Sequence, residues 1–344
     1  MYTFVKNLIR FGIFFYFKSV KMYGREKIPK TGSVVFIGNH PNALIDPLLL
    51  ACKNPRAPYF LTRASVFGNK YLNAFFDRIK MLPIYRPRDG KDQMYKNEAV
   101  FKKCEHILGK GNCLGVFAEG SHNIERRIRP LKSGFARIIL GTLDSFPELE
   151  DITIIPVGLN YSDPTEALSK ASVYFGDPIS VKEVLTNLPV EKNQANALRA
   201  FVKEKLEKVS VHVSGDHYNE KINYLNYSKV DLTNPESANS ALRDFDLDKF
   251  KLSKQKSPSH SVFEKILRGF FIVTNLIPYL IWRRLKPSVK DLEFVSTFRF
   301  AICMSLIPLN LLIQFTVLGL FFPSAFTIYI GLYTLAFTSL KLSN

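Results

Sequence analysis

The chain has 344 residues and carries a formal net charge of +17 at pH 7. This length allows one large domain or two small ones. A basic balance of this size fits nucleic acid, an anionic membrane or anionic substrates as partners. We expect no nucleic-acid partner, because the sequence contains no zinc finger, no RNP-like segment and no basic heptad. A membrane surface explains the charge better, since apolar segments are present and anionic lipid attracts nearby Lys and Arg at roughly 1 kcal/mol each.

Residues 1–23 are expected to form one or two helices at a membrane interface. Lys6, Arg10 and Lys18 interrupt the apolar residues and no small-residue cleavage site follows, so a cleavable signal is not indicated. The phenylalanine and leucine side chains between these basic groups suit a helix that lies in the interface. An ordinary helix that covers a protein core is the alternative.

Residues 24–250 are expected to form one α/β domain with a mixed sheet flanked by helices. Strand-like runs alternate with helical stretches over residues 32–180, which is typical of this class. The expected strands are 33–38, 81–85, 112–117, 152–158 and 171–176. The expected helices are 46–52, 68–78, 92–109, 133–143 and 191–213, and residues 214–240 are expected to be a loop. The cysteines show no paired spacing, which indicates reduced thiols rather than disulfides or a zinc site.

Residues 251–261 are expected to be a basic linker, and residues 262–344 a membrane region. No charged residue occurs from Phe300 to Leu340, a stretch long enough for two transmembrane helices of about 20 residues each. Phe322-Pro323-Ser324 could mark the bend of this hairpin. Arg299 and Lys341 flank it, which predicts that both of its ends are cytoplasmic. A buried pair of core helices is the alternative, and whether 262–282 also crosses is left open.

The most informative local feature is a histidine and a carboxylate between a strand-like run and a helical one. His40 follows residues 33–38, and Asp46 lies at the start of the next expected helix. A His oriented by a carboxylate at such a turn is a plausible general base. A histidine that merely hydrogen-bonds near a turn is the alternative.

Three further blocks follow this pair in order along the chain. They are Leu82-Pro83-Ile84-Tyr85-Arg86-Pro87-Arg88-Asp89, then Val116-Phe117-Ala118-Glu119-Gly120-Ser121-His122-Asn123, and finally Ile154-Ile155-Pro156-Val157-Gly158-Leu159-Asn160-Tyr161. Together the four blocks resemble the glycerolipid acyltransferase family, in that family's order and at plausible spacing. The resemblance implies that family's fold and acylation of glycerol-3-phosphate or 1-acylglycerol-3-phosphate. It also implies that Glu119, Gly120 and Ser121 bind the acceptor's glycerol phosphate, and that Pro156 belongs to the acyl-donor side.

Two departures separate this chain from the commonest family pattern. Five residues lie between His40 and Asp46 instead of four, and the third block ends in Ser121-His122 where the family has Thr-Arg. Both variants look like the branch that includes fungal-type glycerol-3-phosphate and dihydroxyacetone-phosphate acyltransferases. The missing arginine leaves open which cation holds the substrate phosphate.

Arg86 and Arg88 are the first candidates for that phosphate, because guanidinium pairs bidentately with it. Lys132 and Arg126 are the second choices, and solvated loop charges are the alternative. Glu119 and His122 could instead be two zinc ligands, but no third ligand occurs at recognisable spacing, so we expect no metal.

The expected reaction is acyl transfer from acyl-CoA or acyl carrier protein to a substrate hydroxyl, with no cofactor. His40 would take the hydroxyl proton, and Asp46 would fix its tautomer. Backbone amides at the helix start, or Asn42, could stabilise the oxyanion. We expect an integral membrane protein with its catalytic domain on the cytoplasmic face. An inactive membrane-remodelling or scaffold protein of the same fold is the alternative; a pore is not indicated, since the hairpin carries no charge.

Overall fold

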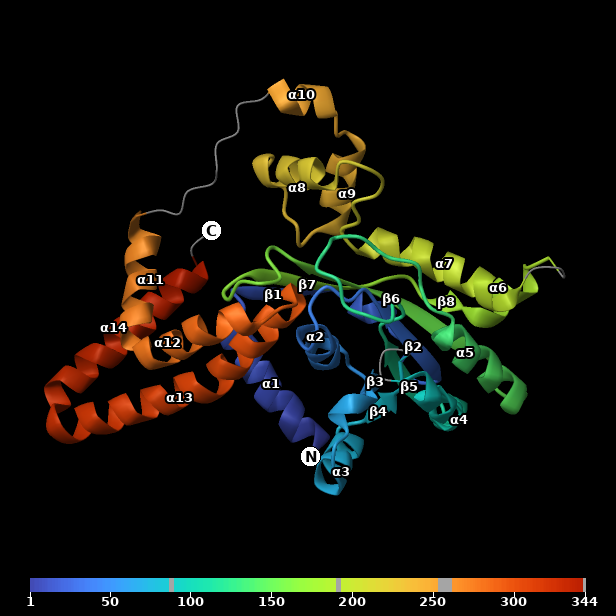
Figure 1. Cartoon of the computed structure of the whole chain (residues 1–344), viewed down its shortest axis with the longest axis horizontal. Helices are drawn as coiled ribbons and strands as arrows, with labels where there is room; N and C mark the ends of the chain where they lie inside the picture. The colour runs from blue at the N-terminus through green and yellow to red at the C-terminus, as the bar shows by residue number, and fades with distance from the viewer. Residues whose placement is uncertain (87–89, 190–192, 253–261, 343–344) are drawn as a thin grey trace.

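The computed structural model describes residues 1–86, 90–189, 193–252 and 262–342. Its centre is an eight-stranded sheet in the order β1-β7-β6-β2-β5-β3-β4, with β8 paired to β6 (Figure 1). The strands are β1 Ser19–Tyr23, β2 Ser33–Gly38, β3 Tyr59–Arg63, β4 Met81–Ile84, β5 Cys113–Val116, β6 Ile152–Tyr161, β7 Lys170–Phe175 and β8 Ile179–Ser180. β7 and β8 run antiparallel to β6, and the other pairs are parallel. The predicted mixed sheet is therefore confirmed.

The core lies on both faces of the sheet because the central strand is apolar throughout. β2 is buried at every position, as expected for a strand with parallel neighbours and helices on both sides. Val35 and Ile37 pack with helical residues such as Val100, Ile138 and Leu198 on one face. Val34 and Phe36 pack with Ile13, Leu49 and Phe300 on the other.

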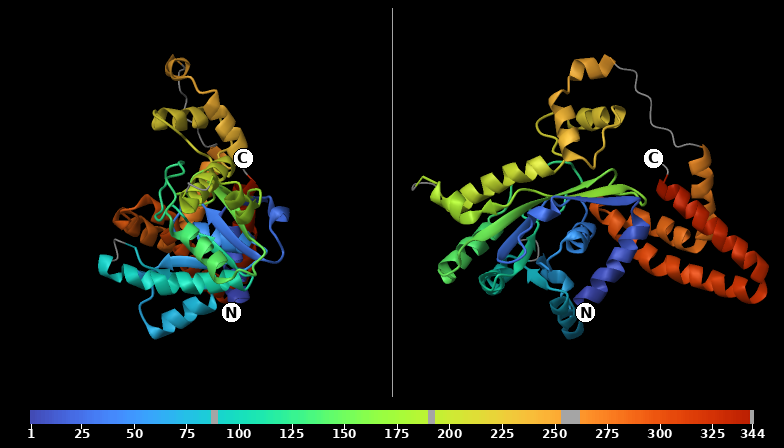
Figure 2. Two further views of the ribbon diagram at one scale, coloured as in Figure 1. Left: turned by 90° about the vertical axis from the view of Figure 1, so that its right-hand side faces the viewer. Right: turned by 180° about the vertical axis from the view of Figure 1, so that it is seen from behind.

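Fourteen helices surround the sheet in the described part of the chain. They are α1 Tyr2–Tyr16, α2 Ile45–Lys53, α3 Lys70–Arg78, α4 Asn97–Gly109, α5 Gly134–Ser145, α6 Val181–Thr186, α7 Gln194–Val209, α8 Tyr218–Tyr227, α9 Pro235–Arg243, α10 Leu247–Leu252, α11 Val262–Thr274, α12 Leu276–Leu285, α13 Val295–Phe321 and α14 Pro323–Leu342. α8 to α10 form a small group that stands away from the sheet (Figure 2). The predicted loop at 214–240 is thus wrong, because α8 and α9 bury Leu225 and Ala238 in a separate small core.

The N-terminal segment is also corrected by the structure. Only residues 2–16 are helical, and residues 19–23 form the edge strand β1, which pairs with β7 in parallel register. β3 was not expected either. Of the expected basic linker, residues 251–252 end α10 and residues 253–261 lie outside the described residues.

The C-terminal helices form the expected hairpin, with α13 and α14 breaking at Phe322. The hairpin packs on α1: the rings of Phe300 and Tyr16 lie 5.3 Å apart, as do those of Phe337 and Phe15. Within the described residues, one helix, Leu292–Phe321, is long and apolar enough to cross a membrane. The helices α11 and α12 are bent by 95° relative to each other, and they would form a second span only if the two together are treated as a single broken helix. α14 does not meet the same criterion, so the expected two-span hairpin is supported in its first helix only.

The bend between α11 and α12 is closed by side chains from α13. The Thr274 carbonyl accepts hydrogen bonds from Asn310 Nδ2 at 3.0 Å and from Gln314 Nε2 at 2.7 Å. These donors satisfy a carbonyl that lacks its usual helical partner, because residue 278 is a proline and has no N–H. The bend is therefore a stable feature of the C-terminal helices.

Candidate active site

The candidate site lies where the sheet's parallel strands end. His40 follows β2, Arg63 ends β3, Arg86 follows β4, and Phe117 follows β5. Parallel strands place their carboxyl ends at one edge, and the loops there are the usual location of ligand sites in α/β folds. Four segments from separate parts of the chain therefore meet at this edge.

His40 and Asp46 form a direct pair. His40 Nδ1 lies 2.8 Å from Asp46 Oδ2, and the Asp46 side chain is fully buried. The same carboxylate oxygen accepts the Asn42 N–H at 2.7 Å, which folds residues 42–45 into the turn that begins α2. This turn accommodates the fifth residue between His40 and Asp46. Because a carboxylate only accepts hydrogen bonds, Nδ1 carries the imidazole proton and Nε2 keeps its lone pair.

The second Asp46 oxygen is held by a residue that the sequence did not indicate. The Tyr161 hydroxyl at the end of β6 donates to Asp46 Oδ1 at 2.5 Å. Tyr161 is 1% exposed, and burial, followed by the nearby Asp46 charge, raises the pKa of its phenol well above the usual value. Tyr161 therefore remains a hydrogen-bond donor to Oδ1, while His40 and the Asn42 N–H hold Oδ2, so both oxygens of the carboxylate are fixed.

We expect Tyr161→Phe to lower kcat by about 10- to 100-fold, because a hydrogen bond to a charged group contributes about 1.5–3 kcal/mol. The acceptor KM should stay unchanged, since Tyr161 does not line the cavity described below. Steady-state kinetics at saturating donor would measure both. A raised KM with an unchanged kcat would contradict a positioning role.

Aromatic contacts fix the plane of the His40 ring. The ring stacks on Phe117 with centroids 4.2 Å apart, and His122 lies edge-on at 5.8 Å. The His40 carbonyl accepts the Asn123 N–H at 2.9 Å, which joins the loops after β2 and β5. Burial lowers the pKa of His122, and the neighbouring His40 and Arg86 act in the same direction, while Glu293 and Asp291 only partly oppose them. His122 is therefore neutral near pH 7 and does not replace the cation of the family's usual arginine.

Glu119 forms an ion pair with Arg129, which belongs to the same loop. The Arg129 Nε donates to Glu119 Oε2 at 2.7 Å, and Arg129 also donates to the hydroxyl and carbonyl of Ser121. Glu119 is 5% exposed; burial raises the pKa of its carboxyl, while Arg129 opposes that rise. Gly120 has φ +77°, a left-handed conformation that favours glycine, and a Cβ there would lie 3.1 Å from Lys132 Cγ. The pair and the glycine together shape the loop that follows β5.

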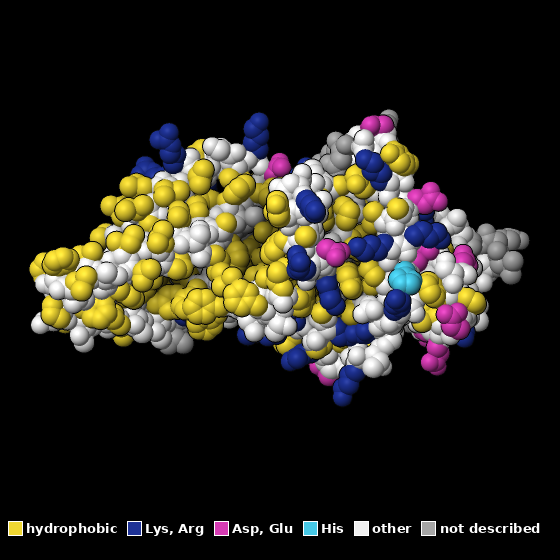
Figure 3. Space-filling model, turned by 90° about the horizontal axis from the view of Figure 1, so that it is seen from below, with side chains coloured by type: hydrophobic (Ala, Val, Ile, Leu, Met, Phe, Trp, Pro, Cys, Tyr) yellow, Lys and Arg dark blue, Asp and Glu magenta, His cyan; other side chains and the backbone are white. Residues whose placement is uncertain are grey.

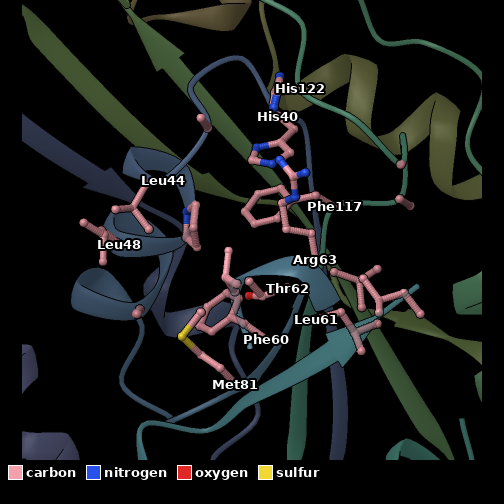
Figure 4. Close-up of a pocket in the computed structure, with 18 of the residues that line it drawn as sticks. His40, Leu44, Leu48, Phe60, Leu61, Thr62, Arg63, Met81, Phe117 and His122 are labelled. Carbon is pink, nitrogen blue, oxygen red and sulfur yellow. The ribbon is translucent and has the colours of Figure 1, made fainter. Parts of the chain in front are cut away.

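A cavity of about 500 Å³ begins at this site. Its polar end contains His40, Arg63, Arg86, Ser121, His122 and Lys132, and the rest of the lining is mostly apolar and comes from α1, α2, α5 and the strands. Figure 4 shows the Arg63 side chain extending from β3 towards His40 and Phe117, with Leu48, Phe60 and Met81 further along the cavity. A chain-like apolar group and an anionic group would both find matching surfaces here.

The other expected site residues divide between the cavity and the surrounding structure. Gly120, Ser121, Arg86 and the second-choice Lys132 line the cavity, whereas Glu119 does not. Arg126 is turned away, since its guanidinium donates to the Ser162 carbonyl at 3.0 Å. Arg88 lies outside the described residues. Within the described part of the chain, no three His, Cys, Asp or Glu side chains gather as a metal site would need.

Pro156 lies in the middle of β6, in register with Ile37 of β2. It lines a separate cavity of about 260 Å³ and does not contact the His40 cavity. Its expected place on the acyl-donor side therefore has no support from the geometry.

Three residues of the site were missed from the sequence: Arg63, Arg129 and Tyr161. Arg63 ends a strand that was not recognised, and Arg129 lies outside the four blocks. Tyr161 closes the fourth block, but nothing in its spacing connects it with a carboxylate 115 residues earlier. The positive charge of Arg63 and Arg129 is the only sequence signal that could have identified these two residues as candidates, and Tyr161 had none.

Comparisons with known proteins match the part of the chain that contains this site. The family model described as Acyltransferase matches residues 19–160. Glycerol-3-phosphate O-acyltransferase 1 of Saccharomyces cerevisiae is 35% identical over 111 residues, which cover 32% of this chain and 14% of that protein. An uncharacterized acyltransferase of Schizosaccharomyces pombe is 32% identical over 118 residues, covering 34% of this chain and 17% of that protein. The matched part thus spans less than a fifth of either curated relative.

Among solved structures, the 1-acyl-sn-glycerophosphate (LPA) acyltransferase PlsC from Thermotoga maritima aligns with a TM-score of 0.43 and 17% identity, covering 61% of this chain and 81% of that one. The matched sequence region contains the sheet's central strands and the His40–Asp46 pair, and it defines an acyltransferase domain. Residues 19–160 thus form a domain of the family described as Acyltransferase, and they are similar to glycerolipid acyltransferases.

Proposed function

We propose that this protein transfers a fatty acyl group from a thioester, acyl-CoA or acyl carrier protein, to a hydroxyl of glycerol-3-phosphate or 1-acylglycerol-3-phosphate. The observation that carries the proposal is the His40–Asp46 pair at the polar end of a largely apolar cavity.

His40 Nε2 acts as the general base in this proposal. It takes the proton as the substrate oxygen attacks the thioester carbonyl, and Asp46 stabilises the imidazolium that forms. The tetrahedral intermediate then expels the thiolate, which receives the same proton from His40. The new ester bond replaces the thioester bond, so no acyl-enzyme is needed.

Asn42 does not line the His40 cavity, so it is not part of the proposed oxyanion hole. Its backbone N–H donates to Asp46, and its side-chain Nδ2 donates to the Pro164 carbonyl at 2.8 Å. The expectation that Asn42 serves in an oxyanion hole is therefore withdrawn. Its two hydrogen bonds fix the turn that carries Asp46.

Arg63 joins Arg86 and Lys132 as the proposed binding set for the acceptor phosphate. All three line the polar end of the cavity, and arginine binds phosphate through two parallel hydrogen bonds. Arg63→Ala and Arg86→Ala should each raise the KM for glycerol-3-phosphate by about 10- to 100-fold, since a hydrogen bond to a charged group contributes about 1.5–3 kcal/mol. Lysine at either position should restore binding only in part.

Arg137 offers a matched control, because it is exposed on α5 and does not line the cavity. Arg137→Ala should leave the acceptor KM unchanged. An Arg63→Ala protein with a raised donor KM and an unchanged acceptor KM would move Arg63 to the thioester side.

The reaction itself is tested with purified protein, each acceptor and each thioester donor, using product mass as the readout. We expect one acylated product whose mass identifies both substrates. A folded protein that makes no product with any combination would favour the alternative, an inactive membrane-remodelling or scaffold protein.

We also propose that α13 anchors the protein in a membrane. Its length, its composition and the exposure of residues such as Leu312 and Leu320 support this placement. The full chain should resist extraction by high salt and carbonate, whereas a truncation at residue 260 should be extracted, because only α1 and the basic surface would hold it. Fractionation and immunoblotting measure this. A carbonate-resistant truncation would place the anchor in α1 instead.

A further inference from the structure

The short helix α3 exposes apolar side chains that no described part of the chain covers. None of its nine residues is buried, although the helix contains Tyr71, Leu72, Phe75 and Phe76. Tyr71 is 87% exposed, Leu72 43% and Phe75 39%. Grouped aromatic and aliphatic exposure of this kind marks an interaction surface, because water solvates it poorly.

The helix is well formed without a covering partner. The Asn69 side chain accepts the N–H groups of Tyr71 and Leu72 at 3.0 and 2.9 Å, an N-terminal cap. Phe67 packs against Phe76 at 5.0 Å from the side of the protein. The exposed edge of α3, defined here as Tyr71, Leu72 and Phe75, is therefore held in place.

This edge is close to α1, whose apolar side chains are also exposed. The ends of the two helices lie beside each other in both views of the chain (Figures 1 and 2). The Nζ of Lys80, just after α3, lies 5.8 Å from the ring of Tyr2. On α1, Phe4 is 72% exposed and Phe11 60%. Seen from below, apolar side chains cover the C-terminal helices and continue into the region where basic side chains gather (Figure 3).

The charge around the two helices is almost entirely positive. Lys70, Arg78 and Lys80 accompany α3, whose one acidic residue, Asp77, pairs with Lys103 at 3.1 Å. α1 carries Lys6 and Arg10 and no acidic residue. An apolar edge with flanking basic residues is the composition that suits a surface of anionic phospholipid.

The cavity extends from the His40–Asp46 pair to the helices α1 and α3. Tyr2 and Val5 of α1, and Val66 and Ile79 on either side of α3, line the cavity that begins at His40. We propose that α3 is a second membrane-contacting element, inserting its exposed edge into the interface of a bilayer that contains anionic phospholipid. The cavity would then be bounded by α1 and α3 at the bilayer surface, where an acyl chain can enter. This inference rests on the proposed membrane-bound acyltransferase.

The chain has one tryptophan, Trp282, which makes a fluorescence test direct. In a Trp282→Phe background, Tyr71→Trp places a reporter on the exposed edge of α3. Tyr227→Trp, on the separate helix α8, is the matched control, and Phe321→Trp reports on the tip of α13. Each full-length protein is reconstituted into phosphatidylcholine vesicles, with and without phosphatidylglycerol, containing lipid brominated near the headgroup or deep in the acyl chain.

We expect the Tyr71→Trp emission in vesicles to lie at shorter wavelength than that of the Tyr227→Trp control. The lipid brominated near the headgroup should quench it, and more strongly when phosphatidylglycerol is present. The Tyr227→Trp control should not be quenched, and Phe321→Trp should be quenched by the deep bromolipid. A quenched Phe321→Trp with an unquenched Tyr71→Trp would overturn the α3 inference and leave the membrane anchor intact.

If neither reporter were quenched, the membrane placement in the proposed function would fail as well. The Tyr71→Trp emission could instead change with protein concentration in detergent and show no quenching in vesicles. That result would overturn the lipid assignment and indicate that the exposed edge of α3 binds a second copy of the chain. Acyl transfer measured on the same samples tests the reaction independently of both results.

Discussion

His40→Ala should abolish acyl transfer while the protein still folds and enters membranes. At the polar end of the cavity, His40 is oriented by a buried carboxylate and stacked on an aromatic ring. Losing a positioned general base usually costs about 10²- to 10⁴-fold in rate. The loss should appear in kcat rather than in the acceptor KM, because the proposed phosphate ligands Arg63, Arg86 and Lys132 remain.

The matched control is His106→Ala, because His106 is exposed on α4 and outside the cavity. Its rate should equal that of the unmodified protein. Product mass and steady-state kinetics on both variants decide the question. A His40→Ala protein that keeps more than about a tenth of the rate has another base.

Arg129→Met should strongly destabilise the protein. It removes the partner of Glu119, whose side chain is 3% exposed, and leaves a buried carboxylate unpaired. Breaking a buried ion pair on one side typically costs about 3–5 kcal/mol. Thermal unfolding of the full chain in detergent would show a lower midpoint than the unmodified protein.

The pH dependence of this loss has a definite sign. Burial raises the pKa of Glu119 in the folded state above its ordinary value of 4.5, and removing Arg129 raises it further. A carboxyl whose folded pKa is raised destabilises the fold at pH values above that pKa. The deficit of Arg129→Met relative to the unmodified protein should therefore be greatest at alkaline pH and shrink as the pH falls towards 4.5.

The double variant Glu119→Gln with Arg129→Met is the control, because a neutral amide does not need a counter-charge. It should recover most of the stability lost in Arg129→Met, and its remaining deficit should not depend on pH in this way. A single and a double variant with equal midpoints would show that Arg129 acts through Ser121 rather than through Glu119.

The sequence by itself determined the central α/β architecture. The run 33–38 is apolar at nearly every position, which predicts a strand covered on both faces, and β2 is that strand. It also determined the His40–Asp46 pair, because six positions separate the two residues and a single turn brings them together. The uncharged stretch from Phe300 to Leu340 similarly predicted long apolar helices, since helix length and composition are local properties.

Only the tertiary structure decided which distant side chains complete the site. Tyr161 reaches Asp46 because β6 lies beside β2, and Arg63 reaches the cavity because β3 lies beside β5. Residues 19–23 became a strand by pairing with β7, some 150 positions further along, although they follow directly on a helix. Local periodicity encodes the type of an element, but the order of strands in a sheet determines which side chains meet, and that order is absent from the spacing of residues.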